Sequence, residues 1–114
     1  MDKIINAIVI EKVQNKINHI KNTIAEIGNK IHIVKFCDNV ETGINAIEKH
    51  HPDLIFLDIN MKDEDGNTLL DRIDKFKFDI IILDNNEFYR LIAKESQKGS
   101  FIIKKIDISE LTNL

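Results

Sequence analysis

Charged side chains follow four apolar runs of this 114-residue chain, at the point where each run ends. In chain order they are Glu11 with Lys12, Asp58, Asp84 and Lys104. Carboxylates bind Mg²⁺ and can accept a phosphoryl group, and a lysine ammonium can neutralise phosphate oxygens. Strand ends are often charged simply because they are exposed. If the runs are neighbouring strands of one sheet, however, these side chains meet at one edge and form a candidate phosphoryl or metal site.

The stretch that positions Asp58 has the pattern of a strand buried on both faces. Pro52 precedes it, the continuous apolar block Leu54–Leu57 forms it, and a polar loop closing on Asp65-Gly66 follows it. Such blocks are typical of the inner strands of parallel sheets. We therefore expect Asp58 at the carboxyl edge of the sheet, where proteins of this class place their chemistry.

Similar apolar runs predict four more strands, over Ile4–Ile10, Ile31–Cys37, Asp79–Leu83 and Phe101–Ile103. Apolar residues spaced three and four apart predict helices over Val13–Ile27, Thr42–His50, Thr68–Phe76 and Phe88 to about Gln97, and Ser109 could cap a last helical turn. Strand and helix thus alternate, with connections too long for hairpins. This alternation is typical of parallel strands joined by right-handed crossovers. We expect a single α/β domain over residues 1–114, with a doubly wound five-stranded parallel sheet between helical layers and a truncated last helix.

Composition excludes several classes of protein. Hydrophobic residues make up 43% and charged residues 31% of the chain, an ordinary globular mixture. A net charge of −3 argues against direct binding of nucleic acid. The single cysteine, Cys37, cannot form an internal disulfide and is expected to be a buried small hydrophobe. The sequence predicts neither a membrane span nor a signal peptide, so a cytoplasmic location is expected.

The chain resembles the receiver domains of two-component response regulators over essentially its whole length. The resemblance rests on Leu57-Asp58, Met61, Asp65-Gly66 and the segment FIIKKID from Phe101 to Asp107. It implies a flavodoxin-like three-layer sandwich and a role in phosphorelay signal transduction. It also implies that the chain is a signalling domain and not an enzyme, beyond the gain and loss of phosphate on one aspartate.

The resemblance assigns a role to several of the charged residues. Asp58 matches the aspartate that accepts a phosphoryl group, and Lys104 matches the lysine that contacts this group. Asp84 occupies the place of the hydroxyl residue that couples phosphorylation to a conformational switch. Phe101 matches the aromatic residue that moves on activation.

A magnesium site is implied beside the acceptor. Its expected ligands are the carboxylates of Glu11 and Asp58 and the backbone carbonyl of Asn60. Lys12, however, stands where the family has a second acid, and its ammonium would repel the metal. A unit charge pair at about 4 Å is worth about 4 kcal/mol at an effective dielectric constant of 20. We therefore expect Mg²⁺ binding to be weak or absent, and Lys12 to pair with Asp58 or Asp84.

Two further departures from the family concern the neighbouring strand ends. An ionised Asp84 cannot donate the hydrogen bond that a hydroxyl would give to a phosphoryl oxygen, and it would repel the phosphate. Lys105 replaces the proline that normally follows the strand-five lysine. Phosphorylation is accordingly expected to be impaired or unusual.

The resemblance also implies partners. These are a histidine kinase or a phosphotransfer protein, and an output domain or partner protein that contacts the Phe101–Ile103 strand and its flanking helices. A homodimer is allowed as well, whereas direct contact with nucleic acid or membrane is not expected.

Three alternatives remain open at this point. The first is a pseudo-receiver that binds a partner protein independently of phosphorylation, which Lys12 and Asp84 favour. The second is a phosphohydrolase with an aspartyl nucleophile, which Asn60 disfavours because that class has an acid two residues after its nucleophile. The third is a flavodoxin-like carrier of FMN, which the absence of a Ser/Thr-rich phosphate loop after Ile10 disfavours.

Overall fold

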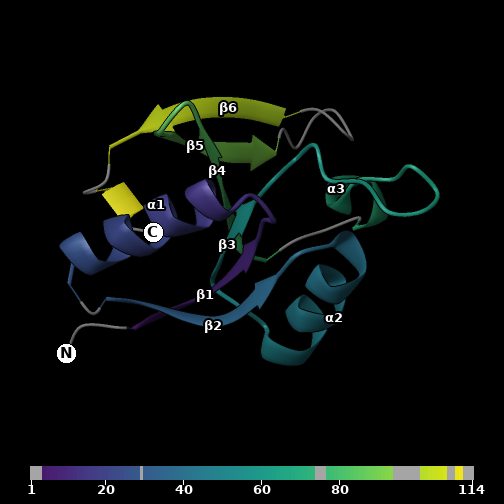
Figure 1. Cartoon of the computed structure of the whole chain (residues 1–114), viewed down its shortest axis with the longest axis horizontal. Helices are drawn as coiled ribbons and strands as arrows, with labels where there is room; N and C mark the ends of the chain where they lie inside the picture. Colours follow the sequence, from purple (N-terminus) through teal and green to yellow (C-terminus); the bar gives the residue numbers. More distant parts are fainter. Residues whose placement is uncertain (1–3, 29, 74–76, 94–100, 108–109, 112–114) are drawn as a thin grey trace.

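A computed structural model describes residues 4–28, 30–73, 77–93, 101–107 and 110–111 of the chain. A single central sheet crosses the molecule and helices lie on both of its faces (Figure 1). The strands are β1 (Ile5–Ile10), β2 (Ile31–Cys37), β3 (Leu54–Leu57), β4 (Asp79–Asp84), β5 (Glu87–Ala93) and β6 (Phe101–Ile106), and the helices are α1 (Gln14–Glu26), α2 (Val40–His50) and α3 (Leu69–Arg72).

The sheet has six strands in the order β2-β1-β3-β4-β5-β6. The first four of these strands are parallel, with pairs β1–β2, β1–β3 and β3–β4. The last two strands pair antiparallel, β4 with β5 and β5 with β6. The α/β class is confirmed, but the prediction of a five-stranded, all-parallel sheet is wrong, because the sheet has a sixth strand and two antiparallel pairs.

The difference arises between β4 and β6, where a helix was expected from Phe88 onward. The chain instead turns back after β4 and forms strand β5; residues 94–97 of the expected helix lie outside the described residues. Phe88 and Leu91 have helical spacing, but they pack into different cores on opposite faces of the sheet. In a strand that is buried on both faces, residues three apart point in opposite directions, so a spacing of three does not identify a helix there.

The turn between β4 and β5 makes this hairpin. Asn85 and Asn86 have φ angles of 50° and 62°, and they connect the paired residues Asp84 and Glu87. Two consecutive left-handed residues are typical of the type I′ turn of a two-residue hairpin, and asparagine tolerates that conformation better than most residues. The hairpin was missed because Asn-Asn is a weaker turn signal than Asn-Gly.

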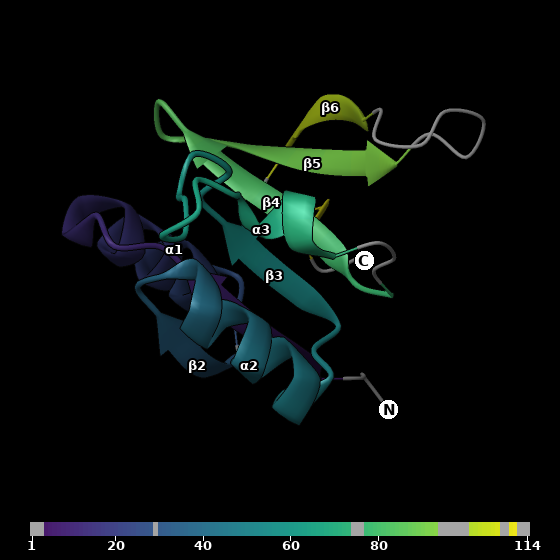
Figure 2. The same ribbon diagram turned by 90° about the vertical axis from the view of Figure 1, so that its right-hand side faces the viewer.

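Buried side chains form two cores, one on each face of the sheet. On one face, α1 packs Ile20 into a cluster that includes Phe56 of β3. On the other face, α2 and α3 pack Val40 and Leu69 into a cluster that includes Ile55. Figure 2 shows α2 and α3 together on one side of the sheet, away from α1. Each fully buried large apolar side chain contributes roughly 1.5–3 kcal/mol, so strands β1 and β3 are held firmly from both sides.

The helices differ in detail from their predicted bounds. α2 begins two residues earlier than expected because the Asn39 side chain accepts a hydrogen bond from the Thr42 N–H at 2.8 Å. α3 ends at Arg72, since Ile73 is extended, and a capping box joins Thr68 to Asp71; residues 74–76 of the expected helix lie outside the described residues. The expected last helical turn is a short 3-10 turn at Glu110–Leu111, and Ser109 lies outside the described residues.

Two expectations from composition can be compared with the structure. Cys37 is buried, as predicted. Within the part of the chain that is described, every helix is too short or too polar to span a membrane.

Candidate functional site

Three carboxylates lie where the strands of the parallel half of the sheet end. Glu11 directly follows β1, Asp58 directly follows β3, and Asp84 is the last residue of β4. The ladder between β1 and β3 brings the first two strand ends together, because the Asp58 N–H donates to the carbonyl of Ile10 at 3.0 Å. The predicted meeting of Glu11, Asp58 and Asp84 at the carboxyl edge of the sheet therefore agrees with their positions.

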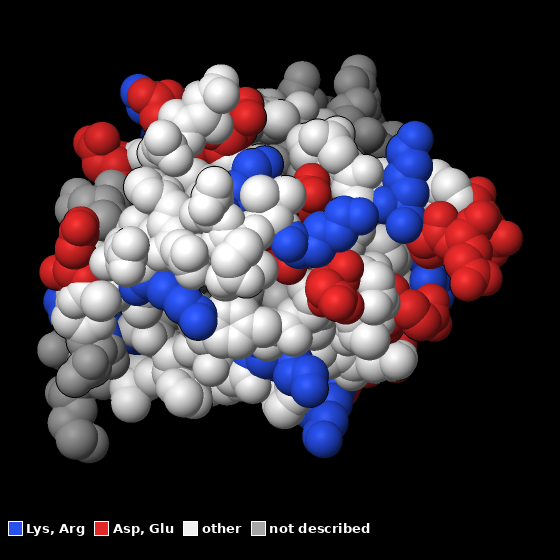
Figure 3. All heavy atoms as spheres, viewed as in Figure 1, with Lys and Arg blue, Asp and Glu red and all other residues white. Residues whose placement is uncertain are grey.

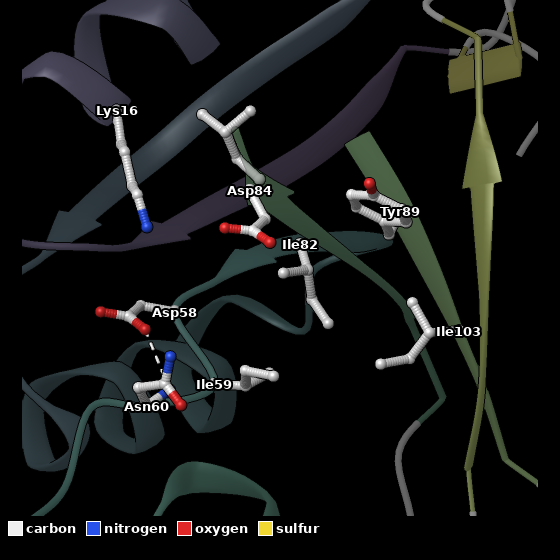
Figure 4. Close-up of a pocket in the computed structure, with 9 residues that line it drawn as sticks. Lys16, Asp58, Ile59, Asn60, Ile82, Asp84, Tyr89 and Ile103 are labelled. Atoms are coloured by element: carbon white, nitrogen blue, oxygen red, sulfur yellow. Dashed lines mark hydrogen bonds between the residues drawn. The ribbon is translucent and has the colours of Figure 1, made fainter. Parts of the chain in front are cut away.

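A pocket of about 340 Å³ opens beside Asp58 at this edge. Its lining combines two acids and one lysine with apolar side chains from the sheet (Figure 4). The lining residues are Lys16, Asp58, Ile59, Asn60, Ile82, Leu83, Asp84, Tyr89 and Ile103. In Figure 4 the charged side chains lie on one side of this pocket and the apolar side chains on the other.

The Asp58 carboxylate is held by the loop that follows it. Its Oδ1 accepts a hydrogen bond from the Asn60 N–H at 2.9 Å (dashed in Figure 4). The backbone carbonyl of Asp58 accepts a further hydrogen bond from the Met61 N–H at 3.3 Å. Within the described part of the chain, no hydrogen bond engages Oδ2. The side chain is only partly buried. Asp58 thus presents one oriented carboxylate with a free oxygen to an incoming group.

Glu11 lies next to Asp58 but is much less accessible, with 5% of its surface exposed. Its Oε1 accepts a hydrogen bond from the Val13 N–H at 3.4 Å. Burial raises the pKa of Glu11 above 4.5, and the negative charge of Asp58 raises it further, whereas the charge of Lys16 and the Val13 hydrogen bond oppose the shift. The two carboxylates therefore repel each other, and a cation between them would relieve that repulsion.

Lys12 does not take the position expected of it. Its side chain is exposed, it is not among the residues that line the Asp58 pocket, and it forms no ion pair in the described structure. The expected pairing of Lys12 with Asp58 or Asp84 is therefore wrong, because the backbone after β1 directs this side chain to solvent.

Lys16 is a site residue that our sequence reasoning missed. It lies in the first turn of α1, where its N–H donates to the Val13 carbonyl at 3.1 Å. In Figure 4 its ammonium points toward the carboxylates of Asp58 and Asp84. One feature of the sequence could have indicated this role. A lysine in the first turn of a helix is unfavourable to the helix dipole, and α1 has no acidic residue in that turn to offset it.

Lys104 lies outside the pocket. It is exposed on β6 and stands opposite Arg90 of β5, while its neighbour Ile103 lines the pocket. Two features of the fold account for this. β5 is inserted between β4 and β6, which moves Lys104 about 5 Å further from β4 than a directly paired strand would be. Alternation along β6 also points Lys104 to the opposite face from Ile103.

Phe101 and Asp84 were expected to form a switch. Phe101 starts β6, is partly buried and packs against the core on the α2 and α3 face. Asp84 lines the pocket from the end of β4, with an exposed side chain. The two residues lie toward opposite ends of the sheet, because β6 runs in the same direction as β4.

The residues beside Asp58 offer some of the oxygen ligands that magnesium prefers. Within the described residues there is no group of three or more His, Cys, Asp or Glu side chains that could hold a metal. The mutually repelling pair of Glu11 and Asp58 provides two carboxylates, however, and Asn60 adds backbone oxygen at the same edge. Magnesium in phosphoryl-transfer sites is commonly held by one or two carboxylates and retains several waters.

A second acidic surface lies on the loop between β3 and α3, and Figure 3 shows acidic side chains gathered at that end of the molecule. Asp63 Oδ1 accepts the N–H groups of Asp65 and Asn67, both at 2.9 Å. Arg72 forms ion pairs with Asp63, at 3.3 Å, and with Glu41 of α2. These contacts organise the loop, so Asp63 has a structural role apart from the Asp58 pocket.

The sequence matches the response regulator receiver domain over residues 7–114. It is 29% identical over 99 residues to an uncharacterised response regulatory protein of Vibrio cholerae, covering 84% of this chain and 38% of that protein. It is 33% identical over 82 residues to the transcriptional regulatory protein BtsR of Escherichia coli, covering 71% of this chain and 34% of BtsR. The chain thus spans less than two fifths of the length of these relatives.

Proposed function

This chain belongs to the response regulator receiver domain family, and we propose that Asp58 accepts a phosphoryl group in phosphorelay signalling, with a weak or unusual dependence on magnesium. Receiver domains are signalling domains of two-component systems and are generally not enzymes. The observation that carries the proposal is the Asp58 carboxylate itself, which is partly exposed, oriented by Asn60 and directed into a charged pocket.

The chemistry is a transfer of a phosphoryl group from nitrogen to oxygen. A carboxylate oxygen of Asp58 attacks the phosphorus of a phosphohistidine on the donor. The new O–P bond forms while the P–N bond breaks, and the electron pair of that bond stays on the imidazole nitrogen. The product is an acyl phosphate on Asp58. Oδ2 is the oxygen suited to attack, because Oδ1 is held by the Asn60 N–H.

Magnesium, when bound, would neutralise the phosphoryl oxygens that face the carboxylate. Glu11, Asp58 and the Asn60 carbonyl are the groups that would hold it. The affinity is expected to be low because Glu11 is almost fully buried and because Lys16 brings a positive charge into the Asp58 pocket.

A small phosphodonor tests the proposal without a partner kinase. Incubation with phosphoramidate, with and without Mg²⁺, should add one phosphoryl group, which intact-mass spectrometry detects. Asp58→Asn should abolish this modification, whereas Asp65→Asn, which changes an exposed acid of the neighbouring loop, should leave it intact. An unmodified wild-type protein, or equal modification of the Asp58→Asn variant, would contradict the proposal.

A second candidate function is a pseudo-receiver that binds a partner protein without being phosphorylated. Three features favour it: Asp84 replaces a hydroxyl at the pocket, β5 replaces the expected helix, and Lys104 lies outside the pocket. The same assay separates the two functions. A pseudo-receiver would remain unmodified, and its partner binding would be unchanged by Asp58→Asn.

The partners follow from the family and from the size of the relatives. We propose that the described fold is one receiver domain over residues 1–114, located in the cytoplasm, and that a histidine kinase or a phosphotransfer protein is its donor. The relatives extend well beyond the matched segment, and BtsR is named a transcriptional regulator. We propose that β6 and its neighbour β5 carry the signal to an output domain, to a partner protein or to a second copy of the chain.

A further inference from the structure

We propose that Lys16, and not Lys104, supplies the positive charge that holds the phosphoryl group at Asp58. The inference rests on the proposed function and assigns one of its components to a different element, the first turn of α1. Its basis is the lining of the Asp58 pocket, in which Lys16 is the one basic residue among the described residues.

Lys12, Lys104 and Lys16 differ in where their side chains lie. Lys12 is exposed and lies outside the pocket, and Lys104 is exposed on the second strand beyond β4. Lys16 is partly buried and points toward Asp58 and Asp84 (Figure 4). Proximity therefore selects Lys16.

The ammonium of Lys16 is available for a new contact. Within the described structure it forms no ion pair with a carboxylate within 4.0 Å. It also lies in the first turn of a helix, where the partial positive charge of the backbone disfavours a cation. The acids at the strand ends offset that cost, and an incoming phosphoryl dianion would do so more strongly. Lys16 is thus positioned to bridge Asp58 and the group that arrives there.

Charge balance explains why such a lysine is needed. Asp58 and Asp84 both line the pocket, so two negative charges face an approaching phosphoryl group. With phosphoramidate as the donor, a carboxylate oxygen of Asp58 forms the O–P bond, the P–N bond breaks, and the already protonated nitrogen leaves as ammonia. The phosphoryl oxygens stay negatively charged throughout the transfer, so a fixed cation beside them stabilises the transition state.

The first test compares lysine variants in the phosphoramidate assay. Lys16→Met should slow phosphorylation of Asp58 by at least about ten-fold, as expected when one fixed charge that contacts the transferred group is removed. Lys21→Met is the matched control. Lys21 lies on the same helix, but its ammonium lies 5.0 Å from the centroid of the Phe36 ring, so this variant should react like wild type. Lys104→Met represents the competing assignment. A loss in Lys104→Met equal to or greater than that in Lys16→Met would overturn the proposal.

A second test does not require covalent chemistry, so that it separates this inference from the proposed function. In the Asp58→Asn background the pocket has one negative charge fewer, and orthophosphate can be titrated while the amide resonances of Asn60 and Asp84 are followed by NMR. Saturable shifts should appear with Asp58→Asn alone and disappear when Lys16→Met is added. Shifts that survive Lys16→Met, or no shifts in Asp58→Asn, would refute the role of Lys16 even if the wild-type protein is phosphorylated. Loss of the shifts when Lys16→Met is added supports the role of Lys16 even if the wild-type protein is not phosphorylated.

Discussion

At the level of single residues, Glu11 is a carboxyl group whose burial and neighbours disfavour its charged form. Its pKa is raised above 4.5, first by burial and then by the charge of Asp58. A raised pKa in the folded state means that the fold favours the protonated acid. The stabilisation from this group is therefore complete below the pKa of the unfolded chain and is lost as the pH rises through the pKa of the folded state.

Glu11→Gln should consequently stabilise the protein relative to wild type as the pH is raised. Glutamine keeps an oxygen that can accept the Val13 N–H, but it cannot ionise. Urea unfolding at roughly pH 4 and pH 7 measures the free energy of unfolding of both proteins. The variant should gain stability relative to wild type between the lower and the higher pH. Glu48→Gln, a change on the exposed surface of α2, serves as the control. A shift in the opposite direction would mean that Glu11 is favoured as a carboxylate.

The two neighbours of Glu11 should move its pKa in opposite directions. Asp58→Asn removes a negative charge that raises this pKa, so the pKa should fall; Lys16→Met removes a positive charge that lowers it, so the pKa should rise. Carbon-13 NMR of the Glu11 carboxyl group during a pH titration reports both changes. If neither variant moves the titration, the three side chains do not share one electrostatic environment.

At the level of elements, the β4–β5 turn decides between a hairpin and the helix that periodicity predicted. Asn86 has a φ of 62°, a conformation that glycine adopts freely and alanine does not. Asn86→Ala should therefore destabilise the protein by about 1 kcal/mol, and Asn86→Gly should be neutral or stabilise it slightly. Urea unfolding of both variants measures which of them is more stable. A helix would reverse their order, because alanine exceeds glycine in helix propensity by about 1 kcal/mol.

The contact between α2 and β1 leads to a second prediction for an element. A Cβ on Gly43 would lie 2.8 Å from Cδ1 of Ile10, which is completely buried. Alanine at a helix interior normally gains about 1 kcal/mol over glycine, but overpacking of a core costs about 1–3 kcal/mol. Gly43→Ala should therefore be destabilising in an unfolding experiment. Its cost should fall in an Ile10→Val background, where Cδ1 is absent; an equal cost in both backgrounds would mean that another contact is responsible.

At the level of the whole molecule, the sheet has a buried centre and one thinly covered edge. β1 and β3 are each flanked by strands on both sides and covered by helices on both faces, whereas β6 is an edge strand whose Ile102 and Ile103 are 47% and 53% exposed. Edge strands with exposed apolar side chains are surfaces at which other chains can pair.

Hydrogen exchange should reflect this gradient in stability. Amides of β1 and β3 should exchange only through global unfolding, and those of β6 should exchange at least about a hundred-fold faster through local opening. Mass spectrometry of exchanged peptides measures the difference. Strong protection of β6 that disappears on dilution would instead show that a second copy covers this edge.

The sequence by itself determined the part of the site that depends on local pattern. The apolar runs before Glu11, Asp58 and Asp84 predict β1, β3 and β4, and crossover connections make these strands parallel. Parallel strands end at one edge, so the three carboxylates had to meet there. The same local reasoning predicted the polar loop that follows Asp58 and the burial of Cys37.

Tertiary structure alone decided which lysine joins those carboxylates. The spacing of Phe88 and Leu91 suits a helix as well as a strand between two cores, and only pairing with β4 and β6 selects the strand. That choice moves Lys104 away from the pocket and leaves Lys16 as its basic residue among the described residues. Strand pairing joins residues that are distant in the sequence, and its energy comes from cross-strand packing that no short window of sequence contains.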